Sequence, residues 1–416
     1  MDKLEIRGGK KLAGSTRIKG AKNAVLPLLA ASILTDEATT IKDCPQIADV
    51  EMMQNILKLL GVSVVKEGGS ITTYGRLEGA EIPGCLAREM RSSIFLLGAI
   101  LAREKHARVA YPGGCEIGKR PINLHIDGFR RMNIGIEERG DEIICSTDVI
   151  KGADICLKIP SVGATENLIL AGALAEGVTT IRNAAREPEI TDLQDFINAM
   201  GGKVSGAGTA VIKIQGVDGL HGAAHTPIPD RITAGTLIIA VCVAGGEITL
   251  ENVEPSHLCS LLTKLPKSAC GYRVDCDNIT VYSRGRGKCI SFVETEPYPG
   301  FPTDLQPQFM TLMAVSNGVG VIRENIFENR FAHAAELRKM DAAIIVDGVT
   351  ATVTGGRLKG AEVTANDLRG GAGLVLAGLA AEGVTTVLEP HHIDRGYEKL
   401  EAVLASLGAD IKRITL

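Results

Sequence analysis

The sequence has no tryptophan, and aromatic residues make up only 3% of its 416 residues. So few rings argue against the stacking platforms that hold single-stranded nucleic acid, and a formal net charge of −4 argues against a general polyanion binder. No apolar run reaches about 18 residues, so no membrane span is expected. The N-terminal MDKLEIRGGKK has no apolar signal segment. We therefore predict neither a nucleic-acid partner nor a membrane partner.

Motifs for metals and nucleotide cofactors are missing as well. The ten cysteines are scattered, with no Cys-x-x-Cys pair and no Cys/His cluster at zinc spacing. The P-loop, G-x-G-x-x-G and H-E-x-x-H motifs do not occur. His391 and His392 are adjacent, which favours a structural role over a helical metal pair. Cysteines without a disulfide pattern fit a reducing cytoplasm, where we expect the chain to reside.

What the sequence does contain is an internal repeat. An apolar helix-like stretch, a turn and a short β-branched strand recur six times. The equivalent strand positions are separated by 68, 72, 69, 72 and 65 residues and lie at Ile41, Val109, Ile181, Leu250, Ile322 and Val387. An amphipathic helix and often a β-hairpin follow each one, so each repeat is predicted to be βαβαββ.

The second half of the first repeat shows the pattern residue by residue. A helical stripe is predicted at Ile56, Leu57, Leu59 and Leu60. Gly61 is the predicted left-handed end of this helix. Val62, Val64 and Ile71 are predicted strand residues, and Gly68-Gly69 is the predicted hairpin turn.

Six such repeats are too long and too mixed for a solenoid, and they favour two α/β domains of three repeats each. We predict one domain over residues 21–229, and a second formed by residues 1–20 together with 230–416. The break falls near residues 225–235, which include two prolines. The first 20 residues are expected to form a strand-like arm that returns to the C-terminal domain. Two chain crossings of this kind make a hinge, beside which we expect a ligand cleft.

The most informative local segment is PGGCEIGKRP, at residues 112–121. Its glycines permit backbone shapes that other residues resist, and its prolines bracket the loop, so Cys115 is predicted to be displayed there. Lys119 and Arg120 favour a thiolate or hold an anion beside it. A glycine-rich surface turn with an incidental cysteine fits the spacing almost equally well.

Two helix starts carry further candidates. Lys22 and Asn23 stand between a glycine turn and an apolar helix, where a cation adds to the field that attracts anions. A solvated surface lysine is the more ordinary interpretation. Ser161, Gly163 and Thr165 precede an apolar run, and they either cradle a phosphate with backbone amides or cap the helix, which is the commoner role.

Three arginines and an aspartate stand beside special residues. Arg91 and Arg369 precede the apolar helices of their repeats, and Arg395 precedes a glycine. Asp304 lies in FPTDLQPQF, where prolines fix the local chain. Arginine suits bidentate recognition of carboxylate or phosphate, although any one of these residues alone is more commonly part of a surface ion pair. Their matching positions in the repeats indicate helix starts that converge on one cleft.

With these residues assembled, the chain resembles the UDP-N-acetylglucosamine 1-carboxyvinyltransferase family, the enolpyruvyl transferases of peptidoglycan synthesis. The resemblance covers essentially the full length and rests on GAKNA, PGGCEIGKRP, SVGATEN, AAREPEI, PDRI, FPTD, ENRF and HIDRGYE, in this order. It implies two inverse α/β barrels, each of three βαβαββ units. It also implies transfer of the enolpyruvyl group of phosphoenolpyruvate to the 3-hydroxyl of UDP-N-acetylglucosamine, with these two small molecules as partners and with neither a metal nor an organic cofactor.

The resemblance further implies the roles of individual residues. Cys115 matches the loop cysteine that protonates the enolpyruvyl methylene carbon, and Asp304 matches the carboxylate at the sugar hydroxyl, a general base. Asn23 matches a polar contact near the reacting groups. The cations around phosphoenolpyruvate, of which the first and last are also assigned to catalysis, are Lys22, Arg120, Arg369 and Arg395. The UDP-sugar is lined by Arg91, Arg120, Pro121, Ile122, Asn123, Leu124, Ser161, Val162, Gly163, Asp304 and Ile326.

Three segments depart from the pattern of the family. Thr233-Ala234 follows PDRI where Glu-Thr is usual. Asn123 stands where the family usually has aspartate, at the position beside the uracil. Gly370-Gly371 follows DLR where Ala-Ser or Ala-Gly is common, and the extra glycine predicts a looser loop around Arg369. The last two departures motivate one alternative, a weakly active or regulatory paralogue that binds the UDP-sugar. The other alternative is 3-phosphoshikimate 1-carboxyvinyltransferase, which shares the fold but lacks a PGGC-type loop.

Overall fold

The computed structural model of the chain describes residues 2–89, 91–111 and 122–415. These residues divide into two compact units. We call residues 20–111 with 122–228 the N-terminal unit, and residues 2–19 with 229–415 the C-terminal unit. Each unit has a hydrophobic core of its own.

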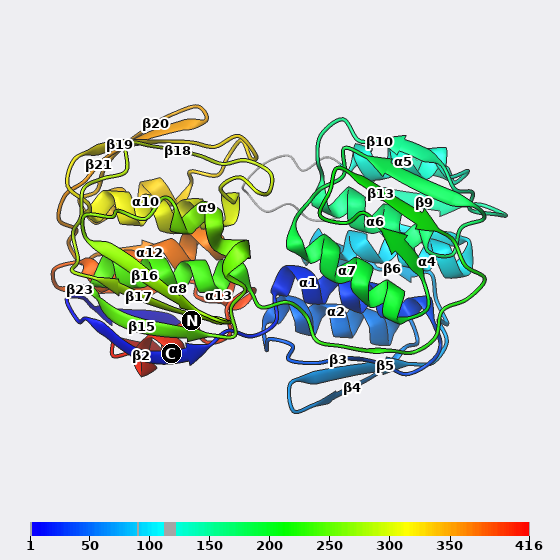
Figure 1. Cartoon of the computed structure of the whole chain (residues 1–416), viewed down its shortest axis with the longest axis horizontal. Coiled ribbons are helices and arrows are strands. Elements are labelled where there is room, and N and C mark those ends of the chain that lie inside the picture. The colour runs from blue at the N-terminus through cyan, green and yellow to red at the C-terminus, as the bar shows by residue number, and fades with distance from the viewer. Residues whose placement is uncertain (1, 90, 112–121, 416) are drawn as a thin grey trace. The chain divides into compact units, whose positions relative to one another are not determined.

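The described part of the N-terminal unit contains three four-stranded sheets (Figure 1). In sheet order, their strands are β14 (Ala224–His225), β3 (Thr39–Ile41), β5 (Ser70–Tyr74) and β4 (Ser63–Glu67); β6 (Glu81–Ile82), β7 (His106–Ala110), β9 (Glu142–Ser146) and β8 (Gly135–Arg139); and β10 (Asp154–Cys156), β11 (Val178–Arg182), β13 (Val211–Gln215) and β12 (Lys203–Ser205). The helices are α1 (Lys22–Ala31), η1 (Ser32–Leu34), α2 (Ala48–Leu59), α3 (Gly84–Glu89), η2 (Arg91–Ile94), α4 (Phe95–Glu104), α5 (Asn123–Arg131), α6 (Val162–Gly172) and α7 (Pro188–Ala199).

The described part of the C-terminal unit also contains three four-stranded sheets. Their strands are β16 (Cys270–Asp275), β17 (Asn278–Ser283), β15 (Gly246–Glu251) and β2 (Leu12–Arg17); β18 (Phe292–Glu294), β19 (Val319–Arg323), β21 (Thr350–Thr354) and β20 (Ala343–Asp347); and β22 (Glu362–Thr364), β23 (Val384–Leu388), β1 (Lys3–Arg7) and β24 (Asp410–Ile414). The helices are α8 (Arg231–Ala244), η3 (Pro255–Leu258), α9 (Cys259–Leu262), η4 (Thr303–Leu305), α10 (Gln306–Val315), α11 (His333–Lys339), α12 (Leu368–Ala380), α13 (His391–Asp394) and α14 (Leu400–Ser406).

All six of these sheets share one pairing pattern. One outer strand runs parallel to its neighbour, and the other two pairings are antiparallel. In the third sheet, for example, β10 is parallel to β11, which continues through β13 and β12 as an antiparallel hairpin. A parallel neighbour requires a crossover, and in this sheet the crossover contains the apolar helix α6. The sheets of β6 to β9, β10 to β13 and β18 to β21 each hold the four strands of one βαβαββ repeat.

Three sheets are completed by strands that are distant in sequence. β14 closes the sheet of the first repeat by pairing in parallel with β3. At the other end of the chain, β2 pairs with β15, and β1 lies between β23 and β24. The N-terminal arm therefore supplies two strands to the C-terminal unit, and both chain ends lie in that unit (Figure 1).

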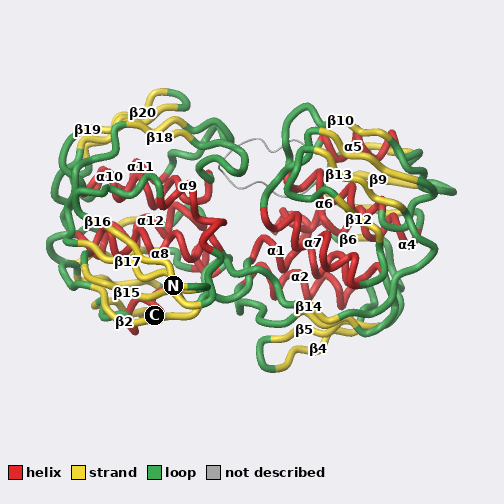
Figure 2. The backbone as a smooth tube through the Cα atoms, in the orientation of Figure 1, coloured by secondary structure: helices red, strands yellow, loops and turns green. Residues whose placement is uncertain are grey.

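Helices occupy the interior of each unit and sheets the outside (Figures 1 and 2). All ten residues of α10 are buried, as are nine of the ten residues of α1. A helix that is apolar all round is stable only when other elements cover it on every side. Strands such as β19 instead bury alternate residues, as expected where one face of a sheet packs on a core. This arrangement agrees with the predicted inverse α/β barrels.

The first repeat shows how far the pattern holds at single residues. Helix α2 ends before Gly61, whose φ of +91° is in the left-handed region, and Gly68 and Gly69 form the hairpin turn with φ of +54° and +85°. Two details differ. Leu59 is 54% exposed and does not belong to the buried stripe, and Val62 precedes β4 rather than starting it.

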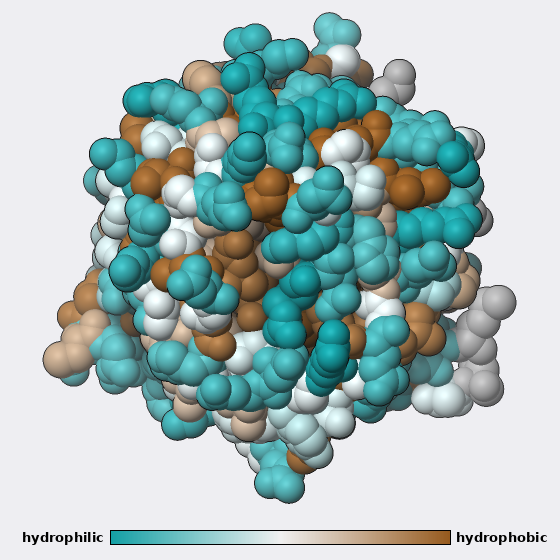
Figure 3. Space-filling model, turned by 90° about the vertical axis from the view of Figure 1, so that its right-hand side faces the viewer, coloured by the Kyte–Doolittle hydropathy of each residue, from teal (hydrophilic) through white to brown (hydrophobic). Residues whose placement is uncertain are grey.

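Figure 3 shows one face of the molecule, on which apolar residues form separate patches between hydrophilic ones. Within the described ranges, no helix is both long and apolar enough to cross a membrane.

Candidate active site

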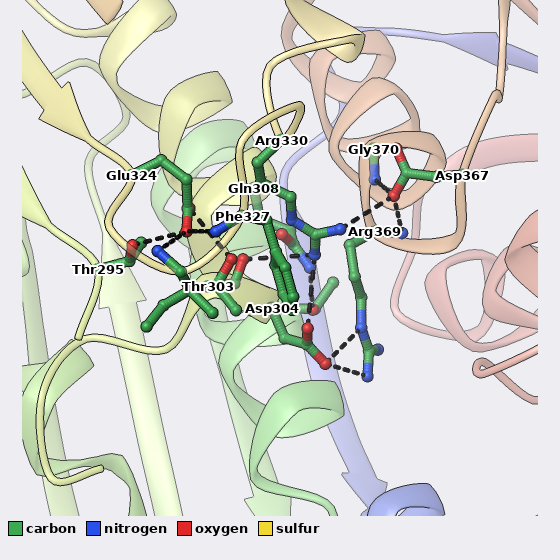
Figure 4. A network of polar contacts seen from close by, with 12 residues as sticks. Thr295, Thr303, Asp304, Gln308, Glu324, Phe327, Arg330, Asp367, Arg369 and Gly370 are labelled. Carbon is green, nitrogen blue, oxygen red and sulfur yellow. Dashed lines mark hydrogen bonds and ion pairs between the residues drawn. The ribbon is translucent and has the colours of Figure 1, made fainter. Parts of the chain in front are cut away.

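A network of charged side chains surrounds Asp304 in the C-terminal unit (Figure 4). Arg369 donates to Asp304 Oδ2 through Nε at 3.2 Å and Nη2 at 3.0 Å. Arg330 donates to Asp304 Oδ1 through Nη2 at 3.4 Å. The two arginine side chains are only 2% and 3% exposed, whereas that of Asp304 is 26% exposed. The carboxylate of Asp304 is therefore partly exposed to solvent, while the two arginines that bind it are buried.

Asp367 links the same network to a helix start. As the N-cap of α12, it accepts hydrogen bonds from the backbone N–H groups of Arg369 and Gly370, both at 3.0 Å. It also accepts from Arg330 Nη1 at 3.5 Å. Arg369 is in the first turn of a capped helix, so its backbone is held in place independently of the contact of its side chain with Asp304.

The prediction of a looser loop at Gly370-Gly371 is wrong. Both residues are buried in α12. A Cβ at position 370 would collide with the Asp367 carboxylate, and a Cβ at 371 would lie 2.8 Å from Ile393 Cγ1. The two glycines allow α12 to pack closely against Asp367 and Ile393, so Arg369 lies in a helix and not in a loop.

A buried polar cluster supports Arg369 from the other side. Its guanidinium lies 5.1 Å from the centre of the Tyr397 ring. Tyr397 Oη contacts Thr236 Oγ1 at 2.8 Å and accepts from Gln308 Nε2 at 3.0 Å. Burial opposes the charge of Arg369, but Tyr397, Asp304 and Asp230 outweigh it and raise the pKa of the guanidinium. Within the described residues, Nη1 of Arg369 has no hydrogen-bond partner. An anionic ligand is the kind of group that satisfies such a buried donor.

His333, at the start of α11, lies behind this network. Burial is the main reason that the pKa of its ring is lowered to about 4; Asp367 opposes this change and Arg330 contributes to it. His333 is therefore neutral at physiological pH and adds no charge to the cluster around Asp304.

In the N-terminal unit, Lys22 is the first residue of α1 and is 7% exposed. Its Nζ lies 2.6 Å from Asp49 Oδ2, and the Asp49 side chain is itself only 6% exposed. A solvated surface lysine, the ordinary interpretation of the sequence, is therefore wrong. A buried lysine is retained where a partner holds its charge. The neighbouring Asn23 is half-buried.

The start of α6 shows which helix-capping expectation holds. Ser161 is the N-cap and accepts from Ala164 N at 3.4 Å, so capping by Ser161 is confirmed. Thr165 does not cap the helix, because its buried hydroxyl accepts from Ala185 N at 3.1 Å. Val162 and Gly163 form the first turn of α6 and are half-buried.

Asn167, one turn further along α6, ties three helices together. Its Oδ1 accepts from Gly98 N at 2.7 Å in α4, and its Nδ2 donates to Ile94 O at 2.7 Å. The second Nδ2 hydrogen points to His125 Nδ1 at 2.9 Å in α5. Because an amide nitrogen only donates, Nδ1 of His125 accepts and its proton is on Nε2. This neutral cluster fixes the start of α5, where the candidates Asn123 and Leu124 lie.

The remaining candidate site residues lie in several elements, and three of them are outside the described part of the chain. Cys115, Arg120 and Pro121 lie outside the described residues, and Arg91 begins η2. Ile122 is the buried N-cap of α5. Arg395 directly follows α13 as its C-cap and, like Ile326, is half-buried.

Of the predicted residues, the structure brings Asp304 and Arg369 together. Sequence reasoning missed their partner Arg330, although it belongs to the ENRF motif, and it missed Asp49 beside Lys22. Among the described residues, no group of three His, Cys, Asp or Glu side chains is arranged to hold a metal ion. The rings of His391 and His392 contact each other, with centres 4.1 Å apart and planes tilted by 36°.

Comparison with known proteins agrees with this architecture. A family model described as EPSP synthase (3-phosphoshikimate 1-carboxyvinyltransferase) matches residues 6–404. UDP-N-acetylglucosamine 1-carboxyvinyltransferase 2 of Caldanaerobacter subterraneus subsp. tengcongensis is 48% identical, with 100% of both chains covered. UDP-N-acetylglucosamine 1-carboxyvinyltransferase of Desulforapulum autotrophicum is 47% identical, again with 100% of both chains covered. The chain belongs to the UDP-N-acetylglucosamine 1-carboxyvinyltransferase family.

Solved structures of related enzymes share the fold. The enolpyruvyl transferase NikO from Streptomyces tendae superimposes with a TM-score of 0.88 at 27% identity, with 100% of this chain and 99% of that chain covered. EPSP synthase from Acinetobacter baumannii has a TM-score of 0.73 at 18% identity, with 100% of both chains covered, which supports the fold alone. The predicted fold, two inverse α/β barrels of three repeats each, is therefore confirmed.

Proposed function

We propose that this chain transfers the enolpyruvyl group of phosphoenolpyruvate to the 3-hydroxyl of UDP-N-acetylglucosamine and releases phosphate. The observation that carries the proposal is full-length identity of 45–48% to curated relatives with this activity in their names. The same comparisons do not favour the alternatives, a regulatory paralogue or a 3-phosphoshikimate enzyme. The reaction is a step of peptidoglycan precursor synthesis.

Phosphoenolpyruvate carries phosphate and carboxylate charges, so fixed cations are needed to desolvate it productively. The proposal assigns this task to Lys22, Arg120, Arg369 and Arg395. Lys22 and Arg369 suit it because both are buried beside carboxylates that hold their charge in place. Their ammonium and guanidinium groups are therefore already ordered before an anion arrives.

Addition across the enol double bond requires a base at the attacking hydroxyl and an acid at the methylene carbon. Asp304 takes the proton of the 3-hydroxyl while the oxygen of that hydroxyl forms a bond to carbon 2 of phosphoenolpyruvate. Cys115 gives its proton to carbon 3, which completes a tetrahedral ketal. The Cys115 thiolate then takes a proton back from carbon 3 as the bond from carbon 2 to the phosphate oxygen breaks, which releases phosphate and restores the double bond.

We also propose which residues bind the UDP-sugar, where the domains lie and where the protein resides. The UDP-sugar is assigned to residues 120–124 and 161–163 together with Arg91, Asp304 and Ile326. Residues 21–229 and residues 1–20 with 230–416 are proposed as the two domains. We propose a cytoplasmic location with no nucleic-acid or membrane partner. The free state of the nine described cysteines is consistent with a reducing compartment.

The experiment is a product analysis with purified protein, phosphoenolpyruvate and UDP-N-acetylglucosamine. We expect equal amounts of phosphate and of enolpyruvyl UDP-sugar, identified by mass spectrometry. The variant Cys115→Ser should lose at least about 100-fold in turnover, as expected when a general acid is removed, with UDP-sugar binding retained. Turnover of this variant at the wild-type rate would show that Cys115 is not the acid.

A further inference from the structure

We infer that Glu324 is a positioning residue whose two carboxylate oxygens serve two different parts of the reaction, an inference that rests on the proposed function. Glu324 follows β19 and is 1% exposed (Figure 4). Its Oε1 accepts hydrogen bonds from Thr295 Oγ1 at 2.8 Å, Ile326 N at 2.9 Å and Phe327 N at 3.1 Å. Its Oε2 accepts from Thr303 Oγ1 at 3.1 Å.

The contacts of Oε1 fix the turn over residues 325–327. Two consecutive backbone N–H groups of this turn converge on one oxygen, and Asn325 N donates to Thr295 Oγ1 at 2.9 Å. Hydrogen bonds to a buried carboxylate are stronger than those between neutral groups. Ile326, which the proposed function places against the UDP-sugar, therefore has a fixed main chain. We assign Oε1 to binding of the nucleotide sugar.

The contact of Oε2 acts on Asp304 instead. Thr303 begins η4 and directly precedes Asp304. Its hydroxyl is held by Glu324, and its carbonyl oxygen accepts from Arg330 Nη2 at 3.4 Å. The residue before the proposed base is thus held by both its side chain and its main chain. We assign Oε2 to the alignment of the Asp304 carboxylate with the attacking hydroxyl.

A second buried glutamate shows that burial alone does not produce this arrangement. Glu166 in α6 is 1% exposed, yet within the described residues neither of its carboxylate oxygens has a hydrogen-bond partner. Glu324 has the same side chain and the same burial, but it accepts four hydrogen bonds, from Thr295, from Thr303 in η4 and from two backbone groups of the turn over residues 325–327. The proposed base lies in η4, and a proposed UDP-sugar contact lies in the turn.

Two isosteric substitutions separate the two oxygens. Thr303→Val removes the contact to Oε2, and we expect kcat to fall about 10-fold, with KM for UDP-N-acetylglucosamine within about twofold of wild type. Thr295→Val removes a contact to Oε1 and is the matched control. For this variant we expect KM for the nucleotide sugar to rise about 10-fold, with kcat within about threefold. Thr303→Ser retains the hydroxyl and should restore kcat.

Calorimetric titration of each variant with UDP-N-acetylglucosamine provides a readout independent of turnover. Thr295→Val should weaken binding and Thr303→Val should not. If wild type turns over but both variants change kcat and KM together, or Thr303→Val leaves kcat unchanged, the assignment of the two oxygens is wrong and the proposed function stands. If wild type binds the nucleotide sugar without turnover, the proposed function fails and the titrations still decide the role of Oε1. If wild type shows neither binding nor turnover, both proposals fail.

Discussion

The two units are built from the same repeat but hold their candidate residues by different means. In the C-terminal unit, four charged side chains, Asp304, Arg330, Asp367 and Arg369, form one network. In the N-terminal unit, a buried hydrogen-bonded cluster centres on Asn167 and is neutral. Within the described residues of that unit, the candidate cation with a carboxylate partner is Lys22. The same fold therefore positions residues either by charge or by neutral hydrogen bonds, and substitutions in the two units should have different consequences.

The largest effect should follow from breaking the charged network. Asp304→Asn keeps the shape of the side chain but removes the base, and kcat should fall about 1,000-fold, equivalent to ~4 kcal/mol. Steady-state phosphate release measures this. Asp341→Asn, an exposed aspartate paired with Lys359 in the same unit, is the control and should retain wild-type kcat. Equal kcat for Asp304→Asn and wild type would exclude Asp304 as the base.

Breaking the neutral cluster should affect stability before chemistry. Asn167→Leu leaves Gly98 N, Ile94 O and His125 Nδ1 without their partner, at a cost of about 3 kcal/mol in unfolding free energy. Urea unfolding followed by circular dichroism measures the change. Asn198→Leu, near the end of α7 in the same unit, removes only two partly buried hydrogen bonds to the backbone of Val204. This substitution should lower the unfolding free energy by less. The comparison of the two units fails if Asn167→Leu is as stable as wild type.

The burial of His333 behind the charged network should also make the C-terminal unit sensitive to acid. Because burial lowers its pKa from 6.5 to about 4, the unfolded chain binds a proton that the folded chain excludes. Stability is therefore complete above pH 6.5 and decreases as the pH falls toward 4, by on the order of 3 kcal/mol. His333→Gln should flatten this part of the pH profile of the melting temperature. His106→Gln, at an exposed histidine, should leave the profile unchanged, and a wild-type slope in His333→Gln would contradict the assignment.

The smallest predicted effect is stabilising and lies in the N-terminal unit. Burial, with Glu189 and Glu187 nearby, raises the pKa of Glu166 well above its usual value. The folded chain therefore binds this proton more tightly than the unfolded chain, and stability falls as the pH rises above 4.5. Glu166→Gln should gain about 1 kcal/mol near pH 8 and lose that pH dependence. Glu176→Gln, at an exposed glutamate, should show no gain.

Much of the fold could be predicted from the sequence because the helices, strands and turns of each repeat depend on residues close together in the chain. The helix ending at Gly61 and the Gly68-Gly69 turn depend only on neighbouring residues. Which strands pair in each sheet was harder to predict. β1 and β2 join strands that lie hundreds of residues later in the chain, and a short strand does not specify its partner.

The candidate site was only partly predictable for the same reason. Asp304 and Arg369 were identified by their motifs, but their contact spans 65 residues, and that of Asp304 with Arg330 spans 26. Such pairs form only through tertiary packing. Gly370 and Gly371 show the opposite error, because glycine suggested a flexible loop where both residues lie in a helix and an added Cβ would come too close to Asp367 or Ile393 in their present positions.

The central claim is tested most directly by offering the purified chain two acceptors at matched concentrations with phosphoenolpyruvate and measuring released phosphate. The account predicts sustained release with UDP-N-acetylglucosamine and background release with shikimate 3-phosphate. Release with shikimate 3-phosphate alone, or with neither acceptor, would contradict it.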